Sequence, residues 1–452
     1  MTSKPEVTAA RPGATLSPLE AHYVSQAIRH YCRDNAEAIW RLPVAMAATG
    51  GAEPLPPKLV RVSLPDWAGD AGIDGSLAVP VHLSRDGDGP LWERTAWFSV
   101  IAWYLHGTAE RAFEDIHGPV HSFAFKLTGW PAEMWECAWA NRIVIFLRRW
   151  AAHVQNADED ALFGSRPQAH IVLSHDVDYI AKGFDFRLKQ FIHLGREVLA
   201  RLRPSDGAED KSSIMGSLRK TCLPGDYFTL PALLDMETDL GIKSVIHFYA
   251  RTAQNGRSLM AAFADPRYDV ARPDVVDVIS RFRDGGWRIG LHQSFSAWQS
   301  AERMAEERNK LKEIAGTDID YCRQHWLRFS WRDTWPAQQA AGFKHDGTLG
   351  FNELPGFRTG SALAVSPWGP GDGKPLTIIT RPLIAMDAHA NHFARGADGG
   401  AGHAMRRYVE EVRAVGGEAT IAWHPHTLHT DFAADISYPD FIRSMDLMGA
   451  QP

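Results

Sequence analysis

The chain has 452 residues, of which 45% are hydrophobic and 23% are charged. These values are ordinary for a soluble globular enzyme, and the length allows two or three domains, or one large barrel with an accessory domain. The net charge is −6 and the pI is about 6.4, so the chain has no excess of positive charge to bind a phosphate backbone. Nucleic acid is therefore not expected as a partner.

The cysteines and the N-terminus indicate the compartment. The four cysteines form no CxxC pair, which excludes a zinc site built from cysteine and argues against a disulfide scaffold. Residues 1–16 lack a charged segment followed by an apolar one, so no signal peptide is predicted. No apolar run reaches the ~18 residues that span a bilayer. We therefore expect a cytoplasmic protein without a membrane span.

The N-terminal third is predicted to be mainly helical. Residues 1–15 are rich in Pro, Ala and Thr and are expected to be disordered. A helix is predicted over 18–42, because Ser17 is a suitable N-cap and Glu20 completes a capping box. Further helices with one apolar side are predicted, over 91–107 and 131–153. No cluster of catalytic residue types occurs before about residue 165.

From His170 onward, short β-rich runs alternate with amphipathic helices, which is typical of a parallel sheet with crossover helices. The predicted strands are 170–178, 243–250, 287–294, 320–326, 344–351, 376–387 and 418–425. The predicted helices between them include 228–240, 271–285, 297–315 and 403–415. This pattern indicates a barrel related to the TIM type, in which the active site lies at the C-terminal ends of the strands.

Residues 182–225 interrupt the alternation and are interpreted as an insertion near the active-site face. The insertion contains a basic amphipathic helix from Arg187 to Arg203. A lid, a partner surface and a solvated helix are the three interpretations that this pattern allows.

Two acidic residues follow the first of these strands directly. Asp176 and Asp178 are two positions apart, so their side chains share one face. Two carboxylates held close together repel each other, and one of them needs a proton or a cation. We therefore predict that one binds a metal and the other acts as a general base; a solvated Asp-x-Asp turn is the alternative.

Three further strands end in residues suited to a metal site or to acid–base chemistry. His292 ends the third strand, and neutral imidazole is a usual ligand of zinc and similar ions. Arg323 and His325 share a face of the fourth strand, where an arginine could orient a carboxylate or bind a substrate oxygen. His424 follows the last strand and is a candidate general acid. The run His424-x-His426-x-x-His429 is also compatible with a separate metal cluster.

In this order, the motifs resemble those of the polysaccharide deacetylase superfamily (carbohydrate esterase family 4), in the form of a divergent bacterial subgroup. The matching segments are Ser174 to Asp178, Gly290 to Ser294, Arg323 to Phe329, Asp346 to Gly350, Gly356 to Gly360 and Ala422 to His424. The resemblance covers residues 58 to 447. It implies a distorted (β/α)7 TIM-like barrel over 166–452 and a smaller accessory α/β domain over 58–165, preceded by an N-terminal tail and helix over 1–57.

The resemblance also implies roles for the site residues. Asp176 would be the catalytic base, and His424 and Arg323 would complete the catalytic set. Asp178 and His292 would bind a divalent metal, with Zn²⁺ first and Co²⁺, Mn²⁺ or Ni²⁺ as alternatives. Substrate contacts are predicted for Trp326, Arg328, Trp423 and Arg358.

This chain departs from the family at the third metal ligand. Typical members carry a second ligand histidine four residues after the first, and this position is Ser296 here. A serine hydroxyl is a poor ligand, so His325 is the predicted substitute, with His247 and His175 as further candidates.

The predicted function is hydrolysis of a non-peptide carbon–nitrogen bond, namely removal of an acetyl group from a saccharide or glycan precursor in bacterial polysaccharide biosynthesis. Two alternatives remain open at this point. One is a barrel that has lost catalysis and binds a saccharide or a partner, which Ser296 motivates. The other is hydrolysis of a non-sugar amide at the same site.

Overall fold

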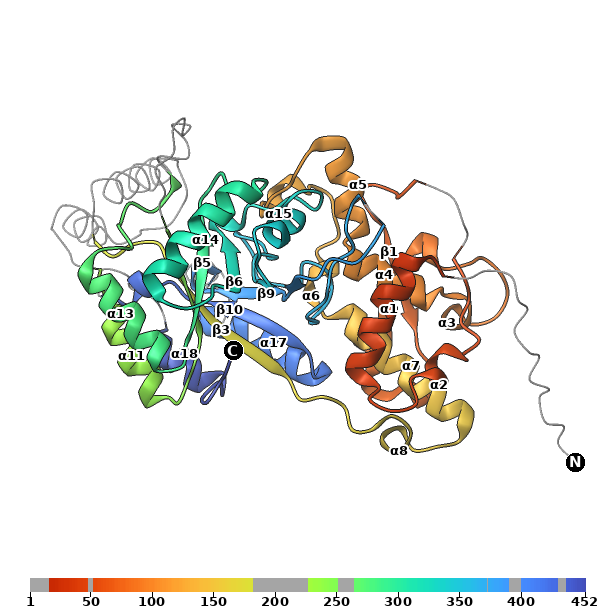
Figure 1. The fold of residues 1–452 in the computed structure, drawn as a ribbon. Coiled ribbons are helices and arrows are strands. Elements are labelled where there is room, and N and C mark those ends of the chain that lie inside the picture. The colour runs from red at the N-terminus through yellow and green to blue at the C-terminus, as the bar shows by residue number, and fades with distance from the viewer. Residues whose placement is uncertain are drawn as a thin grey trace, which may run out of the picture.

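The computed structural model describes residues 16–47, 52–181, 227–250, 264–371, 373–389, 400–429 and 436–452 (Figure 1). The predictions of disorder over 1–15 and of an insertion over 182–225, with its helix from Arg187 to Arg203, lie outside the described residues. Among the described residues, no helix combines the length and the apolar character that crossing a bilayer requires.

The first helix begins as its capping residues predict. Helix α1 (Pro18–Tyr31) has the side chain of Ser17 accepting from the backbone N–H of Glu20, while the Glu20 carboxylate accepts from the backbone N–H of Ser17. The predicted single helix ends early, and a second helix, α2 (Glu37–Trp40), follows. Helix α1 packs on α4 (Trp97–His106) and α7 (Trp139–Gln155).

The rest of the N-terminal region combines a two-stranded ribbon with short helices. Strands β1 (Leu59–Ser63) and β2 (Ser76–Pro80) pair antiparallel. The remaining elements are η1 (Asp66–Ala71), η2 (Val81–Leu83), α3 (Leu91–Arg94), α5 (Thr108–His117), η3 (Ala124–Lys126), α6 (Glu133–Glu136) and α8 (Glu159–Phe163). Figure 1 shows these elements, coloured red to yellow, grouped on one side of the larger sheet.

The larger sheet is parallel throughout and confirms the predicted barrel class. Its order is β8-β7-β6-β5-β4-β3-β10-β9, and each neighbouring pair runs parallel. The strands are β3 (His170–Val177), β4 (Val245–Phe248), β5 (Arg288–Gln293), β6 (Tyr321–Gln324), β7 (His345–Asp346), β8 (Ile379–Thr380), β9 (Leu383–Met386) and β10 (Glu418–Ala422).

The two edge strands of this sheet, β8 and β9, are consecutive in the chain. Both lie within one predicted strand, so the seven predicted strands correspond to eight observed strands. The predicted strand 376–387 is interrupted at Arg381 and Pro382, between β8 and β9. Its first part pairs with β7 and its second part pairs with β10. Proline has no N–H to continue a ladder. One kinked strand therefore joins the two ends of the curled sheet.

Helices cover the outside of this sheet. They are α11 (Leu230–Asp239), α13 (Pro273–Asp284), α14 (Ala301–Ala315), α15 (Thr334–Ala340), α17 (Gly400–Val415) and α18 (Tyr438–Ser444), with the 3-10 turns η4 (His325–Leu327) and η5 (Pro425–Leu428). Figure 1 shows α11, α13 and α18 on the side of the sheet away from the N-terminal elements.

A buried carboxyl group fixes the loop that follows β5. Glu307, on α14, has no solvent exposure, and its Oε2 accepts from the backbone N–H of Ser294 at 3.0 Å. Burial raises the pKa of Glu307 from 4.5 to about 7. Between these two pH values the folded protein keeps a proton that the unfolded chain has lost. The free energy of unfolding therefore falls as the pH rises through this window.

Replacing Glu307 by glutamine should remove this pH dependence. We expect Glu307→Gln to be more stable than the wild type at pH 8, by on the order of 3 kcal/mol, since one pKa unit corresponds to about 1.4 kcal/mol. At pH 5 the two proteins should have similar stability. Urea unfolding at both pH values measures the difference, with the exposed neighbour in Glu306→Gln as the control. Equal destabilisation of Glu307→Gln at both pH values would contradict the assignment.

Candidate metal centre

The predicted site residues come together at the C-terminal ends of the strands. Asp176 is the last residue but one of β3, and Asp178 directly follows that strand. His292 is in β5, and its register partner in β6 is Arg323. Because neighbouring parallel strands end at the same rim of a barrel, residues far apart in the sequence meet there.

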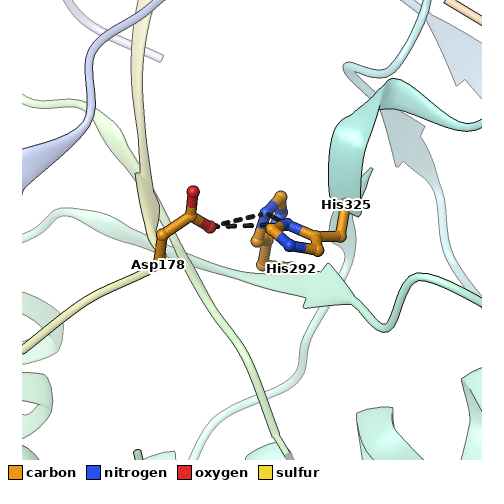
Figure 2. A group of neighbouring side chains, drawn as sticks. All are labelled: Asp178, His292 and His325. Carbon is orange, nitrogen blue, oxygen red and sulfur yellow. Dashed lines mark hydrogen bonds and ion pairs between the residues drawn. The ribbon is translucent and has the colours of Figure 1, made fainter. Parts of the chain in front are cut away.

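Asp178, His292 and His325 form a group in which one ligand atom of each lies within 4.8 Å of the others (Figure 2). Asp178 Oδ1 lies 3.2 Å from His292 Nε2 and 3.4 Å from His325 Nδ1. The two imidazole nitrogens are 2.7 Å apart. Figure 2 shows the carboxylate and both rings pointing toward one another from three separate segments.

The opposite nitrogens of the two rings fix their tautomers. His292 Nδ1 lies 3.2 Å from the carbonyl oxygen of Arg323, and His325 Nε2 lies 2.9 Å from that of Ala264. A carbonyl oxygen only accepts, so these two nitrogens carry the N–H. In neutral rings, the facing nitrogens then both present lone pairs, as does the Asp178 oxygen. Three converging lone pairs require a proton or a cation between them.

These donors fit a divalent metal ion. Two imidazole nitrogens with one carboxylate oxygen form a ligand set that zinc binds in hydrolytic enzymes, where a further position stays open. In each ring, the nitrogen that faces away from Asp178 contacts a backbone carbonyl oxygen. Contacts of this kind orient histidines that bind metal ions. Asp178 Oδ1 is buried and, among the described residues, makes no hydrogen bond of good geometry. Asp178, His292 and His325 would therefore hold the ion.

Asp176 is held by a separate set of charges. Arg323 Nη1 donates to Asp176 Oδ1 at 3.0 Å, and its other nitrogens donate to Ser174 Oγ and to the carbonyl oxygen of Gly347. His247 Nδ1 lies 3.1 Å from the same Asp176 oxygen. Burial acts to raise the pKa of Asp176, but Arg323 and the nearby histidines outweigh it and hold the pKa well below its usual range. Asp176 is therefore ionised at neutral pH.

His424 lies near Asp178 and has a partner that the sequence analysis missed. His424 Nε2 is 3.8 Å from Asp178 Oδ2, and its Nδ1 is 2.6 Å from Asp387 Oδ1. Burial lowers the pKa of His424, but the charge of Asp387 outweighs it, and the pKa rises to about 10. The signal for Asp387 was present, because Leu383-Ile384-Ala385-Met386 runs into it as an apolar strand runs into Asp176.

The two further ligand candidates serve other contacts. His175 Nδ1 lies 2.8 Å from the carbonyl oxygen of Trp423, and its Nε2 lies 3.0 Å from Glu237 Oε1, so both ring nitrogens are engaged away from Asp178. His247 contacts Asp176 instead. Ser296 is also engaged elsewhere, because Arg303 donates to its hydroxyl.

The histidines after β10 do not form a cluster of their own among the described residues. The rings of His424 and His426 have centroids 5.7 Å apart. His426 packs edge-on against Tyr179, and His429 packs against Tyr227. His424 is thus better placed for acid–base chemistry with Asp387 than for sharing a metal with its neighbours.

The four predicted substrate-binding residues separate into two pairs. Trp326 is 45% exposed beside His325, and Arg328 is partly buried over the rings of Phe295 and Trp298. Arg358 and Trp423 are 4% and 3% exposed, respectively.

Arg358 and Trp423 have structural contacts instead of an open face. Arg358 Nη2 donates to Glu110 Oε2 at 2.8 Å, which ties the barrel to α5. The Trp423 ring packs against Tyr438 and Phe441 of α18, with centroids 5.3 Å away in both cases. Neither side chain presents an open face to solvent in this structure.

Fold and site together define a parallel barrel with an Asp-His-His group at its C-terminal rim. No protein-family model matches the chain, and no curated protein matches it.

Solved structures with a similar fold include deacetylases. A protein from Mycobacterium smegmatis provisionally described as a polysaccharide deacetylase is 14% identical, with 64% of this chain and 87% of that chain covered and a TM-score of 0.37. The chitin deacetylase from the fungal pathogen Colletotrichum lindemuthianum is 10% identical, with 63% and 87% covered and a TM-score of 0.31. A carbohydrate esterase family 4 pseudoenzyme from Bacillus anthracis is 7% identical, with 63% of each chain covered and a TM-score of 0.31. At these identities and TM-scores the likeness says nothing of this chain's function. The function is therefore argued from the residues of the site.

The third ligand can be tested by comparing two variants. His325→Ala removes one of three converging donors, so we expect its zinc affinity to fall by at least about 100-fold, the upper range seen for losses around a metal site. Ser296→Ala should bind zinc like the wild type, because Arg303 already occupies the serine hydroxyl. Competition with a chromogenic chelator measures both affinities. Loss of zinc by Ser296→Ala together with retention by His325→Ala would reverse the assignment.

Proposed function

We propose that this protein is a metal-dependent hydrolase that removes the acetyl group from the nitrogen of an N-acetylated saccharide. One observation carries the proposal: the Asp178, His292 and His325 group has an ionised carboxylate, Asp176, two residues before Asp178, and a histidine of raised pKa, His424, whose Nε2 lies 3.8 Å from Asp178 Oδ2. A base and an acid beside an electrophilic centre are what amide hydrolysis requires.

The proposed reaction starts with water. A divalent cation held by Asp178, His292 and His325 would supply Lewis acidity, which polarises an amide carbonyl and makes water more acidic. Asp176 accepts a proton from the water as its oxygen adds to the acetyl carbon. Arg323 keeps Asp176 oriented through the 3.0 Å hydrogen bond and keeps it ionised.

The reaction ends with the departure of the amine. His424 is protonated at neutral pH because its pKa is raised to about 10, and it donates this proton to the amide nitrogen as the carbon–nitrogen bond breaks. The products are acetate and the free amine of the sugar. Asp387 holds the His424 ring through Nδ1, which leaves Nε2 facing the centre.

A saccharide is the proposed substrate for two reasons. The motifs at Asp176 to Asp178, His292, Arg323 and Ala422 to His424 resemble those of carbohydrate deacetylases. In addition, Trp326 presents a half-exposed indole directly after the ligand His325, where the flat face of a sugar ring could stack.

The acid and base roles predict large losses of turnover. We expect Asp176→Asn and His424→Ala each to lower kcat for acetate release from di-N-acetylchitobiose by about 10²- to 10⁴-fold, the usual contribution of general acid–base catalysis. Zinc content and melting temperature of each variant are the controls for an intact site.

Acetate release at the wild-type rate from either variant would contradict its assignment. Absence of acetate release by the zinc-loaded wild type over a panel of N-acetylated sugars would overturn the proposed function. Binding of those sugars without turnover would then favour a binding module, and turnover of small non-sugar amides would favour the other alternative.

Asp387 should affect turnover through His424. We expect Asp387→Asn to lower kcat by roughly 10²-fold or more, because an amide can neither stabilise the imidazolium nor enforce the tautomer. Zinc affinity should change little, since Asp387 lies beside His424 and outside the Asp178 group. Steady-state kinetics with the chelator assay separate the two effects, and parallel loss of zinc and activity would contradict this role.

A further inference from the structure

His175 is a buried ionisable residue that the proposed reaction does not use. Ser174 and Asp176 both accept hydrogen bonds from Arg323, so they share one face of β3, and His175 lies on the opposite face, toward the outer helices. Its ring has no solvent exposure. A fully buried imidazole needs a hydrogen-bonding partner for each nitrogen, and the two partners found here come from different parts of the barrel.

The first partner is the backbone that follows the neighbouring strand. Where the pairing of β10 with β3 ends, the N–H of Trp423 donates to the carbonyl oxygen of Ser174 at 2.9 Å. The carbonyl oxygen of Trp423 accepts from the side chain of His175, whose Nδ1 lies 2.8 Å away. The proposed base, Asp176, directly follows His175. The proposed acid, His424, directly follows Trp423, so this contact immediately precedes both groups.

The second partner is a buried carboxylate. Glu237, on α11, has no solvent exposure, and its Oε1 lies 3.0 Å from His175 Nε2. Three further donors contact this carboxylate: the hydroxyls of Tyr438 and Ser244, each at 2.7 Å, and the indole N–H of Trp287. Burial acts to raise the pKa of Glu237, but the charge of His175 and the hydrogen bonds outweigh it and lower the pKa. The carboxylate is therefore ionised at neutral pH, with all four donors around it.

A buried charged pair of this kind is a poor source of stability. Removing both groups from water costs free energy that their attraction only partly returns, and apolar side chains of similar size often replace such pairs without loss of stability. The pair supplies direction instead, because it fixes the His175 ring at both nitrogens, through Trp423 on one side and Glu237 on the other. The position of the carbonyl oxygen of Trp423 relative to β3 is thereby fixed as well.

The proposed base and acid differ in how else they are held. Asp176 has two partners of its own, Arg323 at 3.0 Å and His247 at 3.1 Å. The ring of His424 is oriented by Asp387, which follows β9 and therefore holds it from the side away from β3. Its place relative to β3 depends on the contact between the two strand ends. Loss of that contact should therefore affect the acid more than the base.

We propose that His175 and Glu237 are positioning residues that set the place of the acid His424 relative to the base Asp176. The inference rests on the proposed function, because it concerns the step in which His424 gives its proton to the departing amine. Both nitrogens of the His175 ring are used away from the metal group, so the pair acts through the backbone of Trp423 and not on the substrate. Its loss should slow proton transfer to the leaving group while zinc affinity and KM stay close to those of the wild type.

The test compares a substrate whose leaving group needs a proton with one whose leaving group does not. The amine of di-N-acetylchitobiose must be protonated as it departs, whereas para-nitrophenolate leaves para-nitrophenyl acetate as an anion. The variant combines His175→Phe with Glu237→Gln, which keeps the size of both side chains and leaves no unpaired charge. We expect kcat for the amide to fall by about 10²-fold, the effect of a misplacement near 1 Å, and kcat for the ester to change by less than about threefold.

Two further variants are the controls. Glu411→Gln weakens another buried ion pair, in which Glu411 lies 2.6 Å from Arg142, and should leave the ratio of amide to ester turnover unchanged. Tyr438→Phe removes one donor from Glu237 and leaves His175 in place, so it should slow amide turnover less than the double variant does. If the double variant does not fold, Glu237→Gln alone gives the same comparison of the two substrates.

The outcomes separate this inference from the proposed function. A loss confined to the amide substrate, at unchanged KM and zinc affinity, would support the positioning role. An equal loss with both substrates would assign the pair a purely structural role and overturn the inference alone, as would unchanged amide turnover. Absence of acetate release by the zinc-loaded wild type over the panel of N-acetylated sugars would overturn the proposed function and this inference together.

Discussion

Two imidazole nitrogens, His292 Nε2 and His325 Nδ1, face each other 2.7 Å apart beside the carboxylate of Asp178. Their opposite nitrogens are committed to backbone carbonyl oxygens, so neither ring can turn its N–H inward without losing a buried hydrogen bond. Converging lone pairs of this kind repel one another unless a proton or a cation lies between them. The strands that end here therefore bring together three side chains that fit a bound cation.

The residues proposed as acid and base have opposite charges, and each charge is set by a partner of its own. Arg323 keeps Asp176 ionised, and Asp387 keeps His424 protonated, although burial opposes both charged forms. Each buried charge is hydrogen-bonded to its partner, which offsets the cost of removing it from water. Two groups whose pKa values are pushed apart within one site are the usual signature of acid–base catalysis.

The barrel and the N-terminal region are linked at the same rim. The segment β8–β9 joins the two edges of the sheet, and Asp387, the partner of His424, directly follows β9. Ser122, in the N-terminal region, donates to the backbone carbonyl of Trp326, the residue after His325. Arg358 binds Glu110 of α5 and adds a buried charged contact between the two regions. Residues next to the candidate site thus also take part in contacts between the barrel and the N-terminal region.

The sequence by itself determined the capping box of α1, the alternation of parallel strands, and the positions of Asp176, Asp178, His292, Arg323 and His424 at strand ends, because these follow from local periodicity and chain order. Only the tertiary structure decided that His325 and not Ser296 lies with Asp178 and His292, that Asp387 contacts His424, and that Arg358 and Trp423 are buried. These outcomes depend on which side chains from distant segments meet and satisfy one another. Local periodicity carries no information about such partners, which the packing of the whole barrel selects.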